Sequence, residues 1–111
     1  MPSHVVRAAD LKLTLTGLPT EQVIAGAPRT GAAAIPAVAG LDVGVWEHTA
    51  GTSRDVETDE VFVVLRGRAT VEVEGGPVLE VGAGDVGVLE AGAHTTWTVH
   101  EDLRKVYISP P

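Results

Sequence analysis

The sequence contains no cysteine, only four aromatic residues among its 111, and no long apolar run. The absence of cysteine excludes disulfide bonds and thiolate metal sites. No stretch approaches the roughly 20 apolar residues that a membrane-spanning helix needs. Since no apolar segment follows a basic start at the N-terminus, we expect no signal peptide, and a cytoplasmic location follows by default.

Basic residues are also few. The chain has eight lysines and arginines and 15 aspartates and glutamates, which gives a formal net charge of −7. A field of this sign repels phosphate backbones and anionic lipid headgroups. We therefore expect neither nucleic acid nor a membrane among the partners of this protein.

The residues that are abundant favour strands over helices. Hydrophobic residues make up 44% of the chain, and most of them are valine, alanine and leucine. A core of β-branched and small aliphatic side chains is typical of β-sheets. The 13 glycines and 7 prolines fit many tight turns. A chain of 111 residues has room for one domain with one core.

Short apolar segments alternate with turns from residue 41 to residue 111. A turn is expected over residues 50–53, and Gly75-Gly76-Pro77 predicts a hairpin turn. The expected strands cover residues 43–49, 60–66, 69–74, 78–81, 86–89, 95–100 and 105–109. Seven or eight short strands at this spacing predict an all-β, antiparallel sandwich or barrel.

Residues 1–40 are expected to add an N-terminal strand and an irregular arm to the same domain. The alternation of leucine with polar residues over 11–15 predicts the strand. Residues 25–40 are rich in alanine and glycine, and Pro28 and Pro36 interrupt any helix there. A short helix over residues 31–34 is the alternative interpretation of this arm.

Two glycine-bounded segments resemble the paired motifs of the cupin superfamily. Glu60, six residues and Gly67 match the end of the first cupin motif, and Gly84, five residues and Glu90-Ala91-Gly92 match the second, with Glu90 in place of proline. Together with 44–47, Trp97 and 103–107, these segments look like the small single-domain cupins related to ureidoglycine aminohydrolase. The resemblance covers roughly residues 22–109 and implies an antiparallel cupin-type jelly-roll β-barrel, with residues 41–111 as the barrel.

The histidines that cupins use as metal ligands are missing from the matching positions. The paired histidines of the first motif fall on Arg54 and Val56, or on Ser53 and Asp55. The histidine of the second motif falls on Thr95, and His94 is one residue away, which points a side chain to the opposite face of a strand. A tight transition-metal site needs three or four convergent ligands, so we expect none. The remaining candidates for a divalent metal are His48, Glu60 and His94.

The same resemblance places two sets of alternating side chains inside the barrel. These sets predict a ligand pocket lined by Trp46, Glu60, Phe62, Val64, Thr95 and Trp97. Such a pocket is mostly apolar, with one carboxylate and one hydroxyl to orient a small ligand. The alternatives are that Trp97 is core packing, that Glu60 is a solvated carboxylate at a strand end, and that 55–60 is a solvated acidic loop.

Two main functions are compatible with this pattern. The first is a small-molecule-binding protein that lacks the usual cupin metal ligands, and its ligand would be neutral or cationic rather than a phosphate. The second is a metal-dependent enzyme resembling ureidoglycine aminohydrolase, which would act on a small ureido or amino compound. An oligomeric structural module is a third. We also expect a homodimer, in which the apolar arm over 23–38 crosses to a partner chain.

Overall fold

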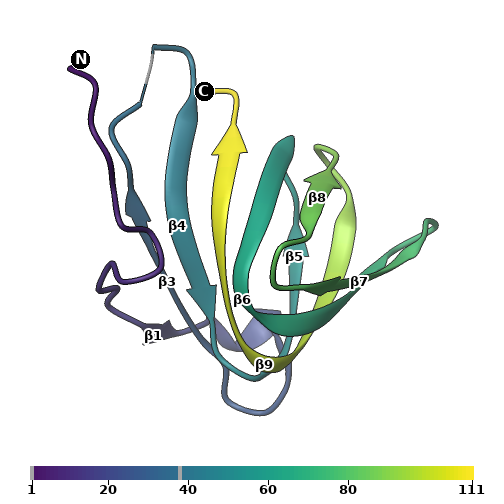
Figure 1. The fold of residues 1–111 in the computed structure, drawn as a ribbon. Helices are drawn as coiled ribbons and strands as arrows, with labels where there is room; N and C mark the ends of the chain where they lie inside the picture. Colours follow the sequence, from purple (N-terminus) through teal and green to yellow (C-terminus); the bar gives the residue numbers. More distant parts are fainter. Residues whose placement is uncertain (1, 38) are drawn as a thin grey trace.

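Nine β-strands and one 3₁₀ turn form the regular structure of residues 2–37 and 39–111, which the computed structural model describes (Figure 1). The strands are β1 (Thr16–Gly17), β2 (Val23–Ala25), β3 (Arg29–Ala34), β4 (Asp42–His48), β5 (Gly51–Val56), β6 (Glu60–Val73), β7 (Val78–Gly82), β8 (Val86–Leu89) and β9 (His94–Ser109). The 3₁₀ turn, η1, covers Thr20–Gln22. None of the helical structure in the described ranges is long and apolar enough to cross a membrane.

Two long strands, β6 and β9, run antiparallel to each other and take part in both halves of the fold. The start of β6 and the end of β9 lie in one sheet, with β8 on one side and β4, β3 and β1 on the other. The end of β6 and the start of β9 lie in a second sheet with β7, β5 and β2. Figure 1 shows the resulting curled shape, and the predicted antiparallel cupin-type jelly-roll barrel is confirmed.

Gly67 forms the corner at which β6 passes from one sheet to the other. Its φ of +89° lies in the left-handed region, and the pairing of β6 with β9 is irregular around it. A Cβ atom at this position would lie 2.2 Å from the carbonyl oxygen of Asp102 on β9. Position 67 therefore requires glycine, both because of the backbone angle and because the two strands approach closely there.

The apolar core lies between the two sheets and is built from alternate residues of the strands. Phe62, Val64 and Leu103 are at most 1% exposed. The rest of the cluster is small or aliphatic apart from Trp97: Ala69, Val71, Val81, Leu89, Trp97 and Val99. The buried cluster thus contains only two aromatic residues, one tryptophan and one phenylalanine, as expected for a sequence with few aromatic residues.

The predicted order of the segments is right, but several predicted boundaries are wrong. Residues 60–66 and 69–74 belong to one continuous strand, as do 95–100 and 105–109, because β6 and β9 bend without breaking. Residues 51–53, expected in a turn, belong to β5. No strand forms over 11–15; the short strand follows at Thr16–Gly17.

The N-terminal arm is more regular than predicted, and no helix forms over residues 31–34. Arg29–Ala34 is a strand that pairs with β4, and Val23–Ala25 pairs with β5. Glycine and alanine, poor strand formers in isolation, are held in β3 by this tertiary pairing. These parts of the arm thus pair with strands of their own chain, whereas the prediction was that the arm crosses to a partner chain. Val38, the last residue of the predicted arm segment, lies outside the described residues.

We predict that Gly67→Ala destabilises the fold more than Gly75→Ala does. Both glycines have positive φ, so both variants carry a backbone cost of about 1–2 kcal/mol. Only Gly67 faces backbone atoms, whereas no atom lies within 4 Å of a Cβ at Gly75. Urea unfolding at one fixed protein concentration measures the difference, and equal losses would contradict the assignment of Gly67 as the corner.

Candidate functional site

A cavity of about 310 Å³ lies inside the barrel, between the inward faces of β3, β4, β5, β6 and β9. Its wall combines tryptophan and tyrosine rings with four carboxylates and two cationic side chains. The lining includes Asp42, Trp46, His48, Ser53, Arg54, Asp55, Glu57, Glu60, Trp97, Lys105 and Tyr107. The volume is at the small end of the range for ligand sites.

Lys105 is the central charged group of this wall. Its Nζ donates to Oε2 of Glu60 at 2.6 Å, and the two side chains are 6% and 13% exposed. The same nitrogen lies 4.6–4.8 Å from the ring centroids of Trp46, Phe62 and Trp97. Each ring presents electron density to the ammonium group, so the cation is held by one carboxylate and three aromatic rings.

Glu57 is a second fixed carboxylate, in the short link between β5 and β6. Its Oε2 accepts hydrogen bonds from Oγ1 of Thr95 at 2.6 Å and from Nε1 of Trp97 at 3.0 Å. These donors lie on β9, and they hold one oxygen of Glu57 while Oε1 takes no part in either bond. The carboxylate is therefore positioned before any ligand binds.

His48 and Ser53 form a buried polar pair on the same wall. Nδ1 of His48 donates to the carbonyl oxygen of Thr49 at 2.6 Å, so Nε2 accepts from the Ser53 hydroxyl at 2.8 Å. Burial lowers the pKa of His48, and the positive charge of Lys105 acts in the same direction. The hydrogen bond to Thr49 raises the pKa but does not outweigh burial. Both nitrogens of the neutral ring are already used by the protein.

Two further groups of the wall, Asp55 and Tyr107, have raised pKa values. Desolvation raises the pKa of Asp55, although one side of the residue is exposed, and the negative charges of Glu57 and Glu60 add to the shift. Desolvation likewise raises the pKa of Tyr107, with contributions from Asp42 and Glu60. Burial and the neighbouring carboxylates therefore both disfavour ionisation of these two side chains.

Two glycines make room for aromatic rings in and behind the wall. A Cβ at Gly87 on β8 would lie 2.1 Å from the Phe62 ring, and one at Gly44 on β4 would lie 2.3 Å from the Tyr107 hydroxyl. Phe62 pairs with Gly87 across the ladder, and Tyr107 pairs with Gly44. The outer end of each ring therefore extends over a neighbouring strand at a residue that has no side chain.

The residues predicted to line a pocket divide into two groups. Trp46, Glu60 and Trp97 line the cavity. Phe62, Val64 and Thr95 lie behind the lining: Val64 is part of the core, Phe62 supports Lys105, and Thr95 holds Glu57. The wall also contains Lys105, Glu57 and Tyr107, which the sequence interpretation did not include. Lys105 alternates with Leu103 and Tyr107 along the strand, and this periodicity indicates that its side chain faces inward with theirs.

The residues of this wall do not fit a cupin metal centre. Among residues 2–37 and 39–111, no three histidine, cysteine, aspartate or glutamate side chains are grouped to hold a metal ion. His48 is engaged by Thr49 and Ser53, and Glu60 is paired with Lys105. His94 is exposed at the start of β9 and lines a neighbouring hollow of about 730 Å³ rather than the cavity itself. The three candidate ligands therefore do not converge on one point.

We predict that Lys105→Met lowers the free energy of unfolding by about 3 kcal/mol or more, because it leaves the carboxylate of Glu60 buried without its partner. The double variant Glu60→Gln, Lys105→Met removes both charges. Its loss in free energy of unfolding should be smaller than the losses of the two single variants added together. Urea unfolding of the four proteins measures the coupling. Strictly additive losses would show that the pair does not interact.

We predict that His48 makes stability fall as the pH drops below about 6.5, its value in the unfolded chain. The pKa of the folded form is lower, so between the two values the unfolded chain binds the extra proton and folding weakens. The loss is at most about 1.4 kcal/mol per pH unit. Melting curves at pH 7.5 and 5.5 should show a smaller drop for His48→Gln than for the unsubstituted protein; an equal drop would contradict this.

The fold is shared with several solved structures. EutQ of Clostridium difficile is 15% identical, with a TM-score of 0.75, over 96% of this chain and 86% of that one. A candidate ethanolamine utilization protein Q from Salmonella typhimurium is 16% identical, with a TM-score of 0.67, over 90% and 96%. Ectoine synthase from P. lautus is 16% identical, with a TM-score of 0.68, over 100% and 78%. Identities this low show a common fold alone.

No curated protein matches this chain. The family model of EutQ-like cupin domains matches residues 39–107, which is more than half of the chain and includes both glycine-bounded motifs, Glu60, Lys105 and Trp97. The predicted membership of the cupin superfamily is therefore confirmed, and the chain belongs to the family of EutQ-like cupin domains.

Proposed function

We propose that this protein binds a small amine or zwitterion in the barrel cavity, without a metal ion. The observation that carries the proposal is the pair of carboxylates fixed on the wall, Glu57 by Thr95 and Trp97 and Glu60 by Lys105. Both are positioned by buried donors, so the site is organised before binding. Little side-chain conformational entropy is then lost when a ligand binds.

The balance of charge supports a ligand that carries a positive group. Four carboxylates, from Asp42, Asp55, Glu57 and Glu60, line the cavity with only two cationic side chains. The neutral form of His48 adds no positive charge. An ammonium group would be attracted by this balance, whereas a phosphate would be repelled.

The two cationic side chains favour a second, negative end on the ligand. Lys105 lies on the inner wall, and Arg54 lies on the exposed side of the same cavity. Nζ of Lys105 has three donors, of which Glu60 takes one, so the ammonium can also donate to a ligand oxygen. A compact zwitterion can then place its amine on the carboxylates and its acidic group against Lys105 or Arg54. The apolar part of the ligand would lie against Trp46, which is half-buried, whereas Trp97 is buried beneath it.

The names of two structural neighbours agree with this ligand class. The Salmonella typhimurium protein is described by its role in ethanolamine utilization, and ethanolamine is a small amine. The P. lautus protein is described as ectoine synthase. These names belong to those proteins, and we use them here to choose the first compounds for a binding experiment.

A metal-dependent enzyme resembling ureidoglycine aminohydrolase is the alternative. It would need a divalent metal, and the wall offers Glu60 but no histidine with a free nitrogen to join it. Metal analysis of the purified protein separates the two functions. Stoichiometric manganese, zinc, iron or nickel after purification without chelator would favour the enzyme and contradict the metal-free binder.

We predict that a screen of small metabolites by thermal shift finds amines or zwitterions rather than phosphates, since a ligand of the native state raises the melting temperature. Glu57→Gln should weaken binding of such a hit by about 10-fold or more, as expected for a lost charged hydrogen bond. Glu101→Gln, an exposed residue outside the cavity, is the matched control.

Glu60→Gln tests the second carboxylate in the same assay, at a temperature at which the variant remains folded. Unchanged affinity in both Glu57→Gln and Glu60→Gln would place the ligand elsewhere. Hits that are mainly anions would contradict the charge argument, even if they bind in the cavity.

A further inference from the structure

A serine and a histidine are hydrogen-bonded on the cavity wall in the arrangement that activates a hydroxyl group. The hydroxyl of Ser53 on β5 donates to Nε2 of His48 on β4 at 2.8 Å, and both residues line the cavity. Their exposed fractions are 5% and 1%, so bulk water has little access to the bond. A histidine nitrogen in this position can take the proton of the hydroxyl when the serine oxygen attacks a carbon atom.

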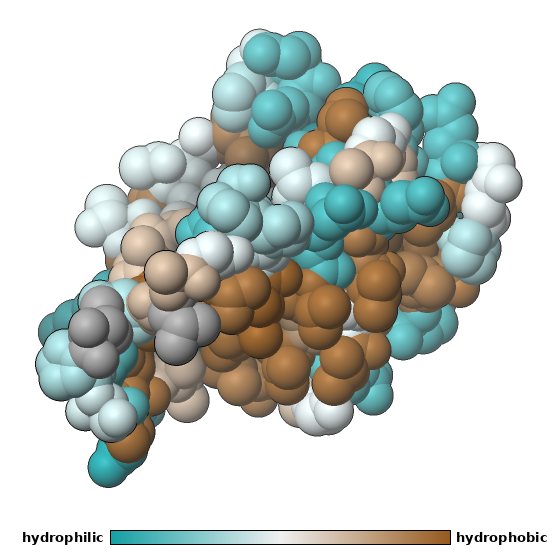
Figure 2. Space-filling model, turned by 90° about the horizontal axis from the view of Figure 1, so that it is seen from above, coloured by the Kyte–Doolittle hydropathy of each residue, from teal (hydrophilic) through white to brown (hydrophobic). Residues whose placement is uncertain are grey.

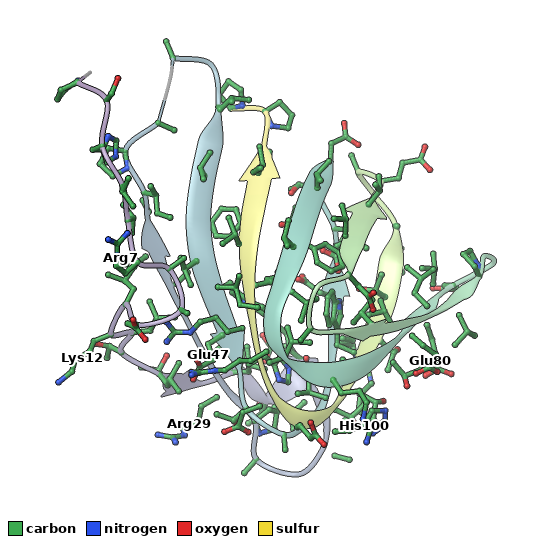
Figure 3. All side chains as sticks on the ribbon, viewed as in Figure 1. Arg7, Lys12, Arg29, Glu47, Glu80 and His100 are labelled. Carbon is green, nitrogen blue, oxygen red and sulfur yellow. The ribbon has the colours of Figure 1, made fainter. Side chains whose placement is uncertain are left out.

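The histidine faces the cavity and not the outer surface of its sheet. Side chains alternate along β4, so His48 and its neighbour Glu47 point to opposite faces. Glu47, which Figure 3 shows at the end of β4, accepts a hydrogen bond from Nε of Arg104 at 2.9 Å. Arg104 also donates to the carbonyl oxygens of Ala8 and Leu11, in the N-terminal segment on the outside of the sheet. A compound that reaches His48 must therefore enter the cavity.

A third group orients the histidine for this role. Nδ1 of His48 donates to the carbonyl oxygen of Thr49 at 2.6 Å, which leaves the lone pair of Nε2 directed at Ser53. Oδ1 of Asp102 accepts from the backbone N–H of Ala50 at 2.8 Å, in the link between β4 and β5. The negative charge of Asp102 acts on the ring of His48 and favours its protonated form. The ring is thus oriented before any reaction, and a carboxylate favours the positive charge that the ring would gain.

A second serine on the same wall serves as an internal comparison. Ser109 also lines the cavity and is 8% exposed, so it is buried to a similar extent as Ser53. His48 is not available to Ser109, because its two ring nitrogens are bonded to Thr49 and Ser53. Of these two serines, Ser53 alone combines a place on the wall with a bond to this base.

The cavity also holds positive charge for an oxygen that becomes negative. Attack of a hydroxyl on a carbonyl carbon moves an electron pair onto the carbonyl oxygen. Nζ of Lys105 has two donors besides the one that Glu60 takes, and its charge is near enough to lower the pKa of His48. Arg54 supplies a second cation on the exposed side of the cavity. Both charges favour a negative intermediate over a neutral ester.

We propose that Ser53 and His48 are a nucleophile and a general base, with which the cavity transfers the acyl group of small esters to water. Oγ of Ser53 bonds to the acyl carbon while its proton passes to Nε2 of His48. The bond from that carbon to the ester oxygen breaks, and His48 gives the proton to the departing alcohol. Water then attacks the acylated serine and gives a proton to His48, the carboxylic acid leaves, and Ser53 regains its proton.

The preferred substrate is an ester that carries an amino group, and this preference rests on the proposed function. The carboxylates of Glu57 and Glu60, on the same wall, would attract the ammonium group of such an ester. The cavity volume of about 310 Å³ limits the substrate to a small compound.

The first test uses methanesulfonyl fluoride, a small neutral reagent that sulfonylates activated serines and releases fluoride. We expect the protein to gain one methanesulfonyl group, which peptide mass spectrometry locates on Ser53 and not on Ser109. The location must be determined, because the broad hydrophobic area on the outside of the molecule, visible in Figure 2, can hold a reagent without reaction. An unmodified Ser53 in the unsubstituted protein would overturn the proposal.

The second test measures turnover of 4-nitrophenyl acetate. Ser53→Ala and His48→Gln should each slow the release of 4-nitrophenol at least ~100-fold, as expected for the loss of a nucleophile or a general base. Ser3→Ala is the control, since Ser3 is exposed and lies outside the cavity. An unchanged rate in Ser53→Ala would contradict the proposal. Should His48→Gln fail to fold by circular dichroism, the rate of Ser53→Ala and the labelling of Ser53 still decide.

A second ester separates this proposal from the proposed function. Glycine 4-nitrophenyl ester carries an ammonium group, and each rate is divided by the rate of the same ester in buffer alone. We expect kcat/KM to be about 10-fold higher for this ester than for 4-nitrophenyl acetate, and the advantage to be lost in Glu57→Gln. Equal values would contradict the preference for amines and leave the catalytic pair. No turnover that depends on Ser53, with amines still raising the melting temperature, would overturn the catalytic pair and leave the binding function.

Discussion

The ladder between β6 and β9 is the constraint on which the rest of this structure depends. These two strands are paired along almost their whole length, and both bend where Gly67 meets Asp102. The bend lets the same pair of strands take part in both sheets, so the core and the cavity are enclosed between them. Without a residue that tolerates both the positive φ and the close approach at position 67, the strands would continue straight and the sheets would not face each other.

The position of Lys105 determines the chemistry of the cavity. An ammonium group inside a protein is costly unless it is paired, and here Glu60 and three aromatic rings share this role. The rings of Trp46 and Trp97 are consequently occupied by a cation of the protein itself. An incoming amine would therefore be attracted by the carboxylates, of which Glu57 has an oxygen outside the bonds to Thr95 and Trp97.

The sequence was sufficient to predict the class of fold and most of the strands after residue 41, because apolar alternation and glycine-rich turns are local signals. It was not sufficient for β3, where glycine and alanine form a strand only because β4 lies beside them. Glu57 was also missed, because it is part of an acidic run and its partners are 38 and 40 residues away. Lys105 had a local signal, its alternation with Leu103 and Tyr107, but the interpretation followed the cupin motif positions instead.

The cavity wall and the outward aliphatic residues of β6 and β9 are two sides of one sheet. Val61 precedes Phe62, and Val106 separates Lys105 from Tyr107, so each outward aliphatic residue is adjacent to an inward residue of the wall. A shift of one residue in the register of β6 would place Glu60 outside and valine inside. The alternation along β6 and β9 therefore specifies which side chains form the cavity wall.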